Sequence, residues 1–127
     1  DKYYMTKKNT NNDDLLALII KGIEDVKGND INILDLREIE NTVCDYFVIC
    51  NGNSNTQVNA IIGSIQKVVS KELKEKPWHV EGEQNGEWVL MDYVSIVVHV
   101  FQKHIREYYN IESLWGDAKI TIIDTNY

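Results

Sequence analysis

The fold is decided by sixteen residues near the middle of the chain, GEWVLMDYVSIVVHVF, which run from Gly86 to Phe101. β-Branched and aromatic residues dominate this stretch, as is typical of strands. A link of two or three residues in its middle predicts an antiparallel hairpin of two strands, 87–92 and 95–101. Within this otherwise strand-like stretch stand Trp88, Asp92 and His99. Either Asp92 and His99 form a catalytic pair, or the stretch forms a surface on which a partner binds.

Helical and strand patterns continue on both sides of the hairpin. Apolar residues at helical spacing predict a first helix over residues 13–28 and a second from Val58 to Leu73, which ends before Pro77. Short β-branched and aromatic runs predict strands within 31–36, 45–50 and 78–81. HIREYYN predicts a short amphipathic helix, with Ile105, Tyr108 and Tyr109 on one side.

This order of elements predicts an α/β domain with a mixed β-sheet of about five strands and helices mainly on one face. The strand–helix–strand unit over residues 45–81 is expected to be a right-handed parallel crossover. With so few helices, much of the other face is expected to be uncovered. We expect residues 1–12 to be a flexible N-terminal arm, 13–119 a single domain and 120–127 a C-terminal tail.

The composition is that of an ordinary globular domain with an acidic balance. The chain has 127 residues and a formal net charge of −7. It shows no basic cluster of the kind that binds nucleic acid, so little direct nucleic-acid contact is expected, and a basic protein suits the charge better. No apolar run approaches the ~20 residues that a membrane span needs. A cytoplasmic protein without a membrane-spanning segment is expected.

Catalytic and metal-binding interpretations have little support in the sequence. His99 with Asp92 as its orienting partner would be a general base, but no nucleophile motif accompanies the pair. The three histidines, at 79, 99 and 104, fit no metal-ligand spacing, and no cofactor is expected. Cys44 and Cys50 would lie ~20 Å apart along a strand, too far apart for a disulfide.

A second enzymatic alternative rests on NGNSNT, residues 51–56, which lies between a predicted strand and a predicted helix. Backbone amides at a helix start can bind phosphate. A nucleotidyltransferase-type enzyme would also need a downstream pair of metal-binding acids, whereas Asp35 and Glu38 stand upstream. The sequence favours a capped helix start, and the enzyme stays an alternative.

Aromatic residues gather in the last 50 positions. Among those that stand there are Trp78, Trp88, Tyr93, Phe101, Tyr108, Tyr109 and Trp115. A small domain with an uncovered sheet face cannot bury all of them, and exposed aromatic residues beside charged ones are typical of protein interfaces. The pattern therefore favours a binding protein over an enzyme.

Four motifs in order, CDYFVICNGNSNTQV, VEG, GEWVLMDYVSIVVHVF and REYYNIESLWGDA, resemble the ribosomal silencing factor family, also called Iojap-like. The resemblance covers about residues 14–119. It implies a nucleotidyltransferase-like α/β fold without the catalytic acids, and a translation repressor rather than an enzyme. The expected partner is the large ribosomal subunit, bound through its fourteenth ribosomal protein. Binding there would sterically block association with the small subunit and slow translation when nutrients are scarce.

The resemblance also implies a partner-binding set, which we list as Trp88, Met91, Asp92, Tyr93 and His99. Because side chains alternate along a strand, these residues cannot all share one sheet face, so some of them must be packing residues. A homodimer of the free protein is a further expectation.

The hairpin turn departs from the family pattern. Family members usually have DYGD where this chain has DYVS, with Val94 and Ser95 as the last two residues. Valine disfavours positive φ, so a different type of turn is expected. The lost acid at Ser95 is expected to weaken contact with a basic partner.

Overall fold

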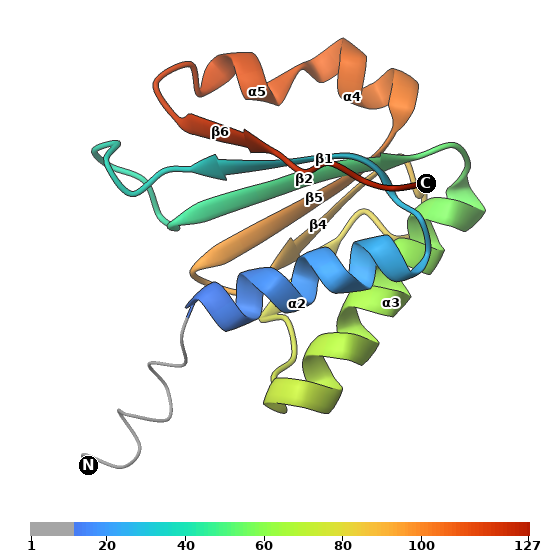
Figure 1. Ribbon diagram of the computed structural model, residues 1–127. Helices are drawn as coiled ribbons and strands as arrows, with labels where there is room; N and C mark the ends of the chain where they lie inside the picture. Colours follow the sequence, from blue (N-terminus) through green and yellow to red (C-terminus); the bar gives the residue numbers. More distant parts are fainter. Residues whose placement is uncertain (1–11) are drawn as a thin grey trace.

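A mixed sheet forms the centre of the molecule, with its strands in the order β3-β4-β5-β2-β1-β6 (Figure 1). The computed structural model describes residues 12–127. The strands are β1 (Asn29–Asp35), β2 (Tyr46–Gly52), β3 (His79–Glu81), β4 (Trp88–Asp92), β5 (Ile96–Gln102) and β6 (Lys119–Ile122). β2 and β5 are parallel neighbours, and the other neighbouring pairs are antiparallel. The predicted mixed sheet is confirmed, but it has six strands within the described residues rather than about five, because the predicted tail begins inside β6.

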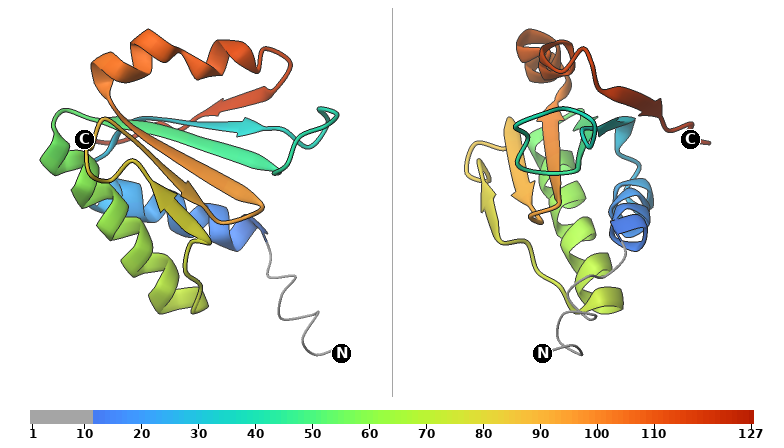
Figure 2. Two further views of the ribbon diagram at one scale, coloured as in Figure 1. Left: turned by 180° about the vertical axis from the view of Figure 1, so that it is seen from behind. Right: turned by 90° about the vertical axis from the view of Figure 1, so that its left-hand side faces the viewer.

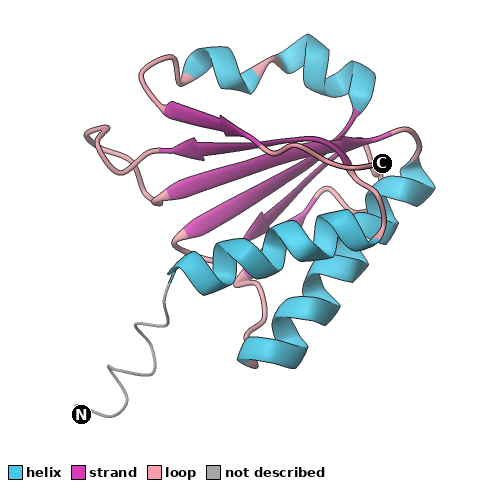
Figure 3. Cartoon of the chain, in the orientation of Figure 1, coloured by secondary structure: helices cyan, strands magenta, loops and turns pink. Residues whose placement is uncertain are grey.

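Helices cover the sheet from both sides (Figures 2 and 3). They are α2 (Asn12–Asp25), α3 (Asn55–Leu73), α4 (Lys103–Tyr109) and α5 (Ile111–Leu114). The two long helices, α2 and α3, lie on one face, and the short α4 and α5 lie on the opposite side. Of the predicted N-terminal arm, residues 1–11 lie outside the described part of the chain, and Asn12 begins α2.

The main core lies between the sheet and the two long helices. One residue in two along β2, β4 and β5 points into it, including Val48, Met91 and Val98, which are fully buried. α2 and α3 approach closely, since a Cβ atom at Gly22 would lie 2.8 Å from the Cα atom of Ile65. The hydroxyl of Ser64 donates a hydrogen bond to the Gly22 carbonyl at 2.6 Å, which ties the two helices together.

The chain leaves the two parallel strands in opposite directions. After β2 it enters α3 on one face of the sheet, and after β5 it enters α4 on the other (Figure 1). β3 runs parallel to β2, but β5 and β4 lie between them, so the predicted strand–helix–strand unit crosses half of the sheet. α3 ends at Leu73, where the apolar stripe ends, with Lys74 in the left-handed conformation at φ 57°.

The turn between β4 and β5 keeps a left-handed residue, although that residue is a valine. Val94 has a φ of 75°, and the Ser95 N–H donates to the Tyr93 carbonyl at 3.0 Å, which closes a three-residue γ-turn. Val94 therefore adopts the positive φ that valine disfavours, and the expected difference in turn type from the family stays a prediction. Neighbouring bonds hold the turn: the Val94 N–H donates to Asp92 Oδ1 at 2.7 Å, and the Ser95 hydroxyl donates to Asn12 Oδ1 at 2.9 Å. These bonds outweigh the intrinsic preference of valine.

Candidate partner-docking face

The sheet face opposite α2 and α3 carries a run of aromatic side chains, which we call the aromatic face. Its members come from three strands, α4 and the segment after α5: Phe47, Trp88, His99, Phe101, Tyr109 and Trp115. The alternation along β2, β4 and β5 places the odd-numbered residues of β2 and β5 and the even-numbered residues of β4 on this side. Phe101 is fully buried, whereas Trp88 is half-buried and Tyr109 is 51% exposed.

Trp88 occupies the middle of the aromatic face. It pairs with Phe101 in the sheet register, and its ring stacks on the Phe101 ring with centroids 4.9 Å apart. It also contacts Tyr109 of α4, at 5.0 Å between ring centroids. Trp88 is therefore fixed by packing while part of its ring stays open to solvent, which is the state of a preorganised interface residue.

His99 accepts a hydrogen bond from Trp88 and thereby orients the indole ring. The indole Nε1–H of Trp88 donates to His99 Nδ1 at 3.1 Å, so the neutral imidazole carries its proton on Nε2. Burial lowers the pKa of His99 to about 4, which keeps the ring neutral near pH 7. The Phe47 ring packs edge-on against it at 4.6 Å. His99 Nε2 is buried and has no hydrogen-bond partner among residues 12–127.

Asp92 takes part in the hairpin turn and does not contact His99 by any hydrogen bond within the described chain. Its Oδ1 atom accepts from the Val94 N–H, and its backbone carbonyl accepts from the Trp78 N–H at 2.6 Å. In the register Asp92 lies opposite Val97, while His99 lies opposite Leu90. The arrangement therefore lacks the hydrogen bond that a catalytic histidine–carboxylate pair requires.

Two residues of the predicted partner-binding set belong to the main core. Met91 is 0% exposed and Tyr93 is 6% exposed, and both pack among the apolar residues on the α2–α3 side. Burial raises the pKa of the Tyr93 hydroxyl. In this conformation Met91 is not accessible to a partner, and only a small part of Tyr93 is accessible. The structure thus separates these two residues from Trp88, Asp92 and His99, which share the opposite face.

The predicted apolar side of α4 is only partly buried, because Ile105 packs against the core while the two tyrosines are exposed. Tyr108 is 80% exposed, whereas Arg106 is buried. The Arg106 guanidinium can be buried because polar groups bind it. Its Nε and Nη2 atoms donate to Glu112 at 3.2 and 2.9 Å, and its Nη1 atom donates to Asn51 Oδ1 at 2.8 Å. Tyr109 is thereby left beside Trp88 at the surface. The signal for it was present in the sequence, since Tyr108 and Tyr109 are adjacent and cannot both face inward.

The features that an enzyme of the nucleotidyltransferase type would need are occupied by internal contacts. Ser54 caps α3 by accepting from the Gln57 N–H at 3.1 Å, and the Asn53 N–H donates to Gln57 Oε1 at 2.7 Å. Asp35 pairs with Arg37 at 2.7 Å, and the hydrogen bond from that guanidinium lowers the pKa of Asp35 to about 2. The described residues contain no group of three or more His, Cys, Asp or Glu placed to hold a metal ion.

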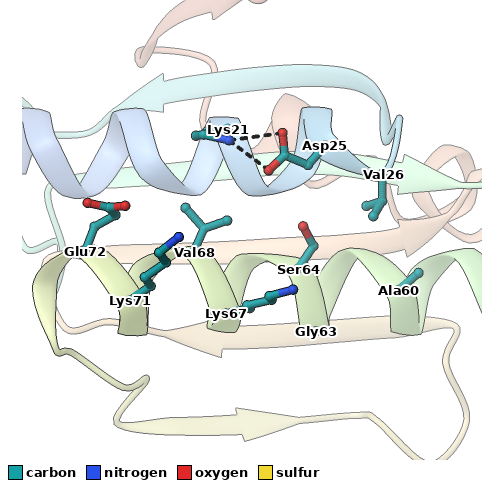
Figure 4. Close-up of a pocket in the computed structure, with 10 residues that line it drawn as sticks. All are labelled: Lys21, Asp25, Val26, Ala60, Gly63, Ser64, Lys67, Val68, Lys71 and Glu72. Carbon is teal, nitrogen blue, oxygen red and sulfur yellow. Dashed lines mark hydrogen bonds and ion pairs between the residues drawn. The ribbon is translucent and has the colours of Figure 1, made fainter.

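A shallow groove of about 490 Å³ lies between α2 and α3, away from the aromatic face (Figure 4). Lys21 and Asp25 pair across its α2 side at 3.0 Å, while Lys67 and Lys71 of α3 project along the other side. The groove displays no buried polar group that awaits a ligand, so the aromatic face remains the stronger candidate site.

Both cysteines, Cys44 and Cys50, are buried and not joined in a disulfide, as expected.

Fold and site together favour a small α/β domain that presents aromatic side chains to a macromolecular partner. Comparison with known proteins agrees with this class. The family model described as ribosomal silencing factor during starvation matches residues 9–126. The chain is 41% identical over 107 residues to the ribosomal silencing factor of Halalkalibacterium halodurans, covering 84% of this chain and 90% of that protein. The Bacillus subtilis ribosomal silencing factor is 41% identical over 114 residues, covering 90% of this chain and 95% of that protein.

A solved structure supports the same assignment. The crystal structure of a protein from Chromobacterium violaceum superposes with a TM-score of 0.77 at 36% identity, covering 90% of this chain and 94% of that one. The chain belongs to the ribosomal silencing factor family. Its relatives are named for a regulatory role and not for an enzymatic activity. No helix within residues 12–127 is long and apolar enough to cross a membrane.

Proposed function

We propose that this protein is a translation repressor that binds the large ribosomal subunit through its fourteenth ribosomal protein and sterically blocks association with the small subunit. The family assignment supports a ribosomal partner. The observation that carries the docking site is the contact between Trp88 and Tyr109, at 5.0 Å, on a sheet face that the long helices leave open.

The docking surface is the aromatic face, with Trp88 and Tyr109 as the residues that touch the partner. Half-buried Trp and Tyr side chains held by their neighbours are typical of interface hot spots. Asp92 lies at the edge of this surface, and His99 acts through Trp88 by holding its indole N–H. Met91 and Tyr93 support the strand from behind. The net charge of −7 favours a basic ribosomal protein as the contact.

Co-sedimentation with isolated large ribosomal subunits tests this proposal. Wild-type protein is expected to sediment with the subunit and to reduce the formation of joined ribosomes when small subunits are added. Tyr109→Ala and Trp88→Ala are expected to weaken binding by about 30-fold or more, as for interface hot spots. Tyr127→Ala is the matched control, because Tyr127 is 47% exposed, close to the 51% of Tyr109, and follows β6.

Three outcomes would contradict the proposal. They are wild-type protein that stays at the top of the gradient, binding that Tyr109→Ala leaves unchanged, and binding that does not reduce subunit joining. Because Trp88 also packs on Phe101, circular dichroism of Trp88→Ala must show a folded protein before its binding is interpreted. A run without subunits reports whether the free protein is a homodimer.

A further inference from the structure

A polar pocket of about 310 Å³ lies under α4, away from the exposed part of the aromatic face. Its lining comes from the start of β1, the end of β2, α4 and α5, and includes Asp30, Asn51, Lys103, Arg106, Glu107 and Glu112. The pocket stands at the carboxyl end of β2, where the chain leaves the parallel neighbours β2 and β5 toward opposite faces. Such switch points are where open α/β sheets bind their ligands.

The floor of the pocket is a built polar network. Arg106 is 8% exposed, and its Nη1 atom donates to the Asp30 carbonyl at 2.5 Å and to Asn51 Oδ1 at 2.8 Å. Glu112 accepts from Nε and Nη2 of the same guanidinium and from Asn32 Nδ2 at 2.7 Å. These bonds neutralise Glu112 and fix the orientation of the Asn51 amide.

The same network leaves two donors of Asn51 unused. Asn51 is 2% exposed, and its Nδ2 atom has no hydrogen-bond partner in the part of the chain that the structure describes. Leaving a buried amide unpaired costs about 1–3 kcal/mol, so this group calls for an acceptor beyond residues 12–127, such as an ordered water or a ligand. Since Arg106 already occupies Oδ1, the missing group must be an acceptor and cannot be a donor.

Charged side chains around the pocket define the rest of the ligand. Lys103 is exposed and makes no ion pair within residues 12–127, and it lines the same pocket as Asn51. Asp30 and Glu107 bring two carboxylates to the same lining. A carboxylate acceptor suits the first pair, and an ammonium group suits the second. The volume lies at the lower end of the ~300–1,000 Å³ range of ligand pockets, which fits a small metabolite.

We propose that this pocket binds a free α-amino acid. The ligand carboxylate accepts from the Asn51 amide and the Lys103 ammonium, and the ligand ammonium donates to Asp30 or Glu107. The inference does not depend on the proposed ribosomal function. The two sites meet in α4, which carries Arg106 toward the pocket and Tyr109 toward the aromatic face.

Isothermal titration of the full chain with each common L-amino acid tests the proposal. At least one amino acid is expected to bind saturably, and its analogues that lack either the amino or the carboxyl group are expected to bind at least about tenfold more weakly, because each loses a charge-assisted contact. Lys103→Gln is expected to weaken binding by a similar factor. Lys67→Gln, an exposed lysine of α3 far from the pocket, is the matched control and is expected to bind like wild type.

Several results would overturn the inference. One is the absence of any binding at millimolar amino acid, which would leave Asn51 to a structural water. Another is equal binding of the carboxylate analogue or of inorganic phosphate, which would make the pocket a simple anion site. Binding that survives both Lys103→Gln and Asn51→Ser would place the ligand elsewhere. Co-sedimentation of Lys103→Gln with large subunits is expected to match wild type, so failure here and failure of the ribosomal proposal are distinguishable.

Discussion

On the side of the sheet that faces α2 and α3, β4 places Val89 and Met91, and both are fully buried. On the other side the same strand places Trp88 and Leu90, which are half-buried. The first face is covered by two long helices that pack through apolar contacts. The second is covered in part by the short α4 and α5, which are held by the ion pair between Arg106 and Glu112. The first face therefore holds the larger buried core, whereas the second combines a smaller buried cluster with aromatic side chains that stay partly exposed.

The largest expected effect compares neighbouring residues on the two faces. Met91→Ala should lower the free energy of unfolding by about 2–5 kcal/mol, because it leaves a cavity in the main core. Leu90→Ala should lower it by clearly less, since Leu90 is half-buried and water can fill the space. Urea unfolding of both variants measures the difference. Equal losses would show that the second face carries as much of the stability as the first.

A pH titration separates the faces next. His99 is neutral in the folded protein, with its pKa lowered by burial from 6.5 to about 4, whereas the unfolded chain takes up a proton near pH 6.5. The unfolded state therefore binds more protons between pH 6.5 and 4, and stability must fall as the pH falls through that window. The loss should reach up to about 3 kcal/mol near pH 4.

His99→Gln should remove this part of the pH dependence. Asp35 provides an internal contrast, because its folded pKa of about 2 lies below the ordinary 3.8, so its contribution is present above 3.8 and is lost as the pH falls toward 2. The two windows therefore do not overlap. Urea midpoints measured at intervals between pH 7 and 4 check the result, and parallel curves for wild type and His99→Gln would contradict the assignment.

Glu112→Gln weakens the attachment of α4 and α5 without touching the main core. Burial raises the pKa of Glu112, but the hydrogen bonds and charge of Arg106, with help from Asn32, outweigh it and lower the pKa overall. Removing this carboxylate charge should cost roughly 1.5 kcal/mol. Amide hydrogen exchange should accelerate in α4 and α5 while α3 keeps its protection. Uniform acceleration across both faces would show that the ion pair stabilises the whole domain.

Much of the fold was predictable because its signals are local. The apolar stripe from Val58 to Leu73 is confirmed as α3, and the alternation from Gly86 to Phe101 is confirmed as a hairpin. Strand β6 (Lys119–Ile122) falls mostly in the predicted tail: its β-branched residues allow a strand, but a short exposed segment does not specify one by itself. It forms only because the free edge of β1 accepts it, which is a tertiary effect.

The sequence predicts a surface rich in aromatic residues, but it does not predict which residues form that surface. Strand alternation already divided Met91 and Tyr93 from Trp88 and Asp92, yet it could not say which side the long helices cover. Burial of Arg106 was invisible to an apolar pattern, because its partners Asn51 and Glu112 are distant in the sequence or on another helix. The position of Tyr109 beside Trp88 follows from that burial.

The smallest expected effect lies in the turn that joins the two strands. Val94 holds a φ of 75°, a conformation that strains a β-branched residue by about 1–3 kcal/mol, and its side chain is 63% exposed, so little packing is lost on truncation. Val94→Gly should relieve the strain, and after the entropy that glycine loses on folding the protein should gain about 1 kcal/mol in stability. Val43→Gly is the matched control, because Val43 is 94% exposed and does not have positive φ; it should gain nothing. Urea unfolding of the two variants decides the point: equal changes would mean that the γ-turn is not strained in solution, whereas a gain confined to Val94→Gly would show that the turn retains a left-handed geometry at the expense of stability.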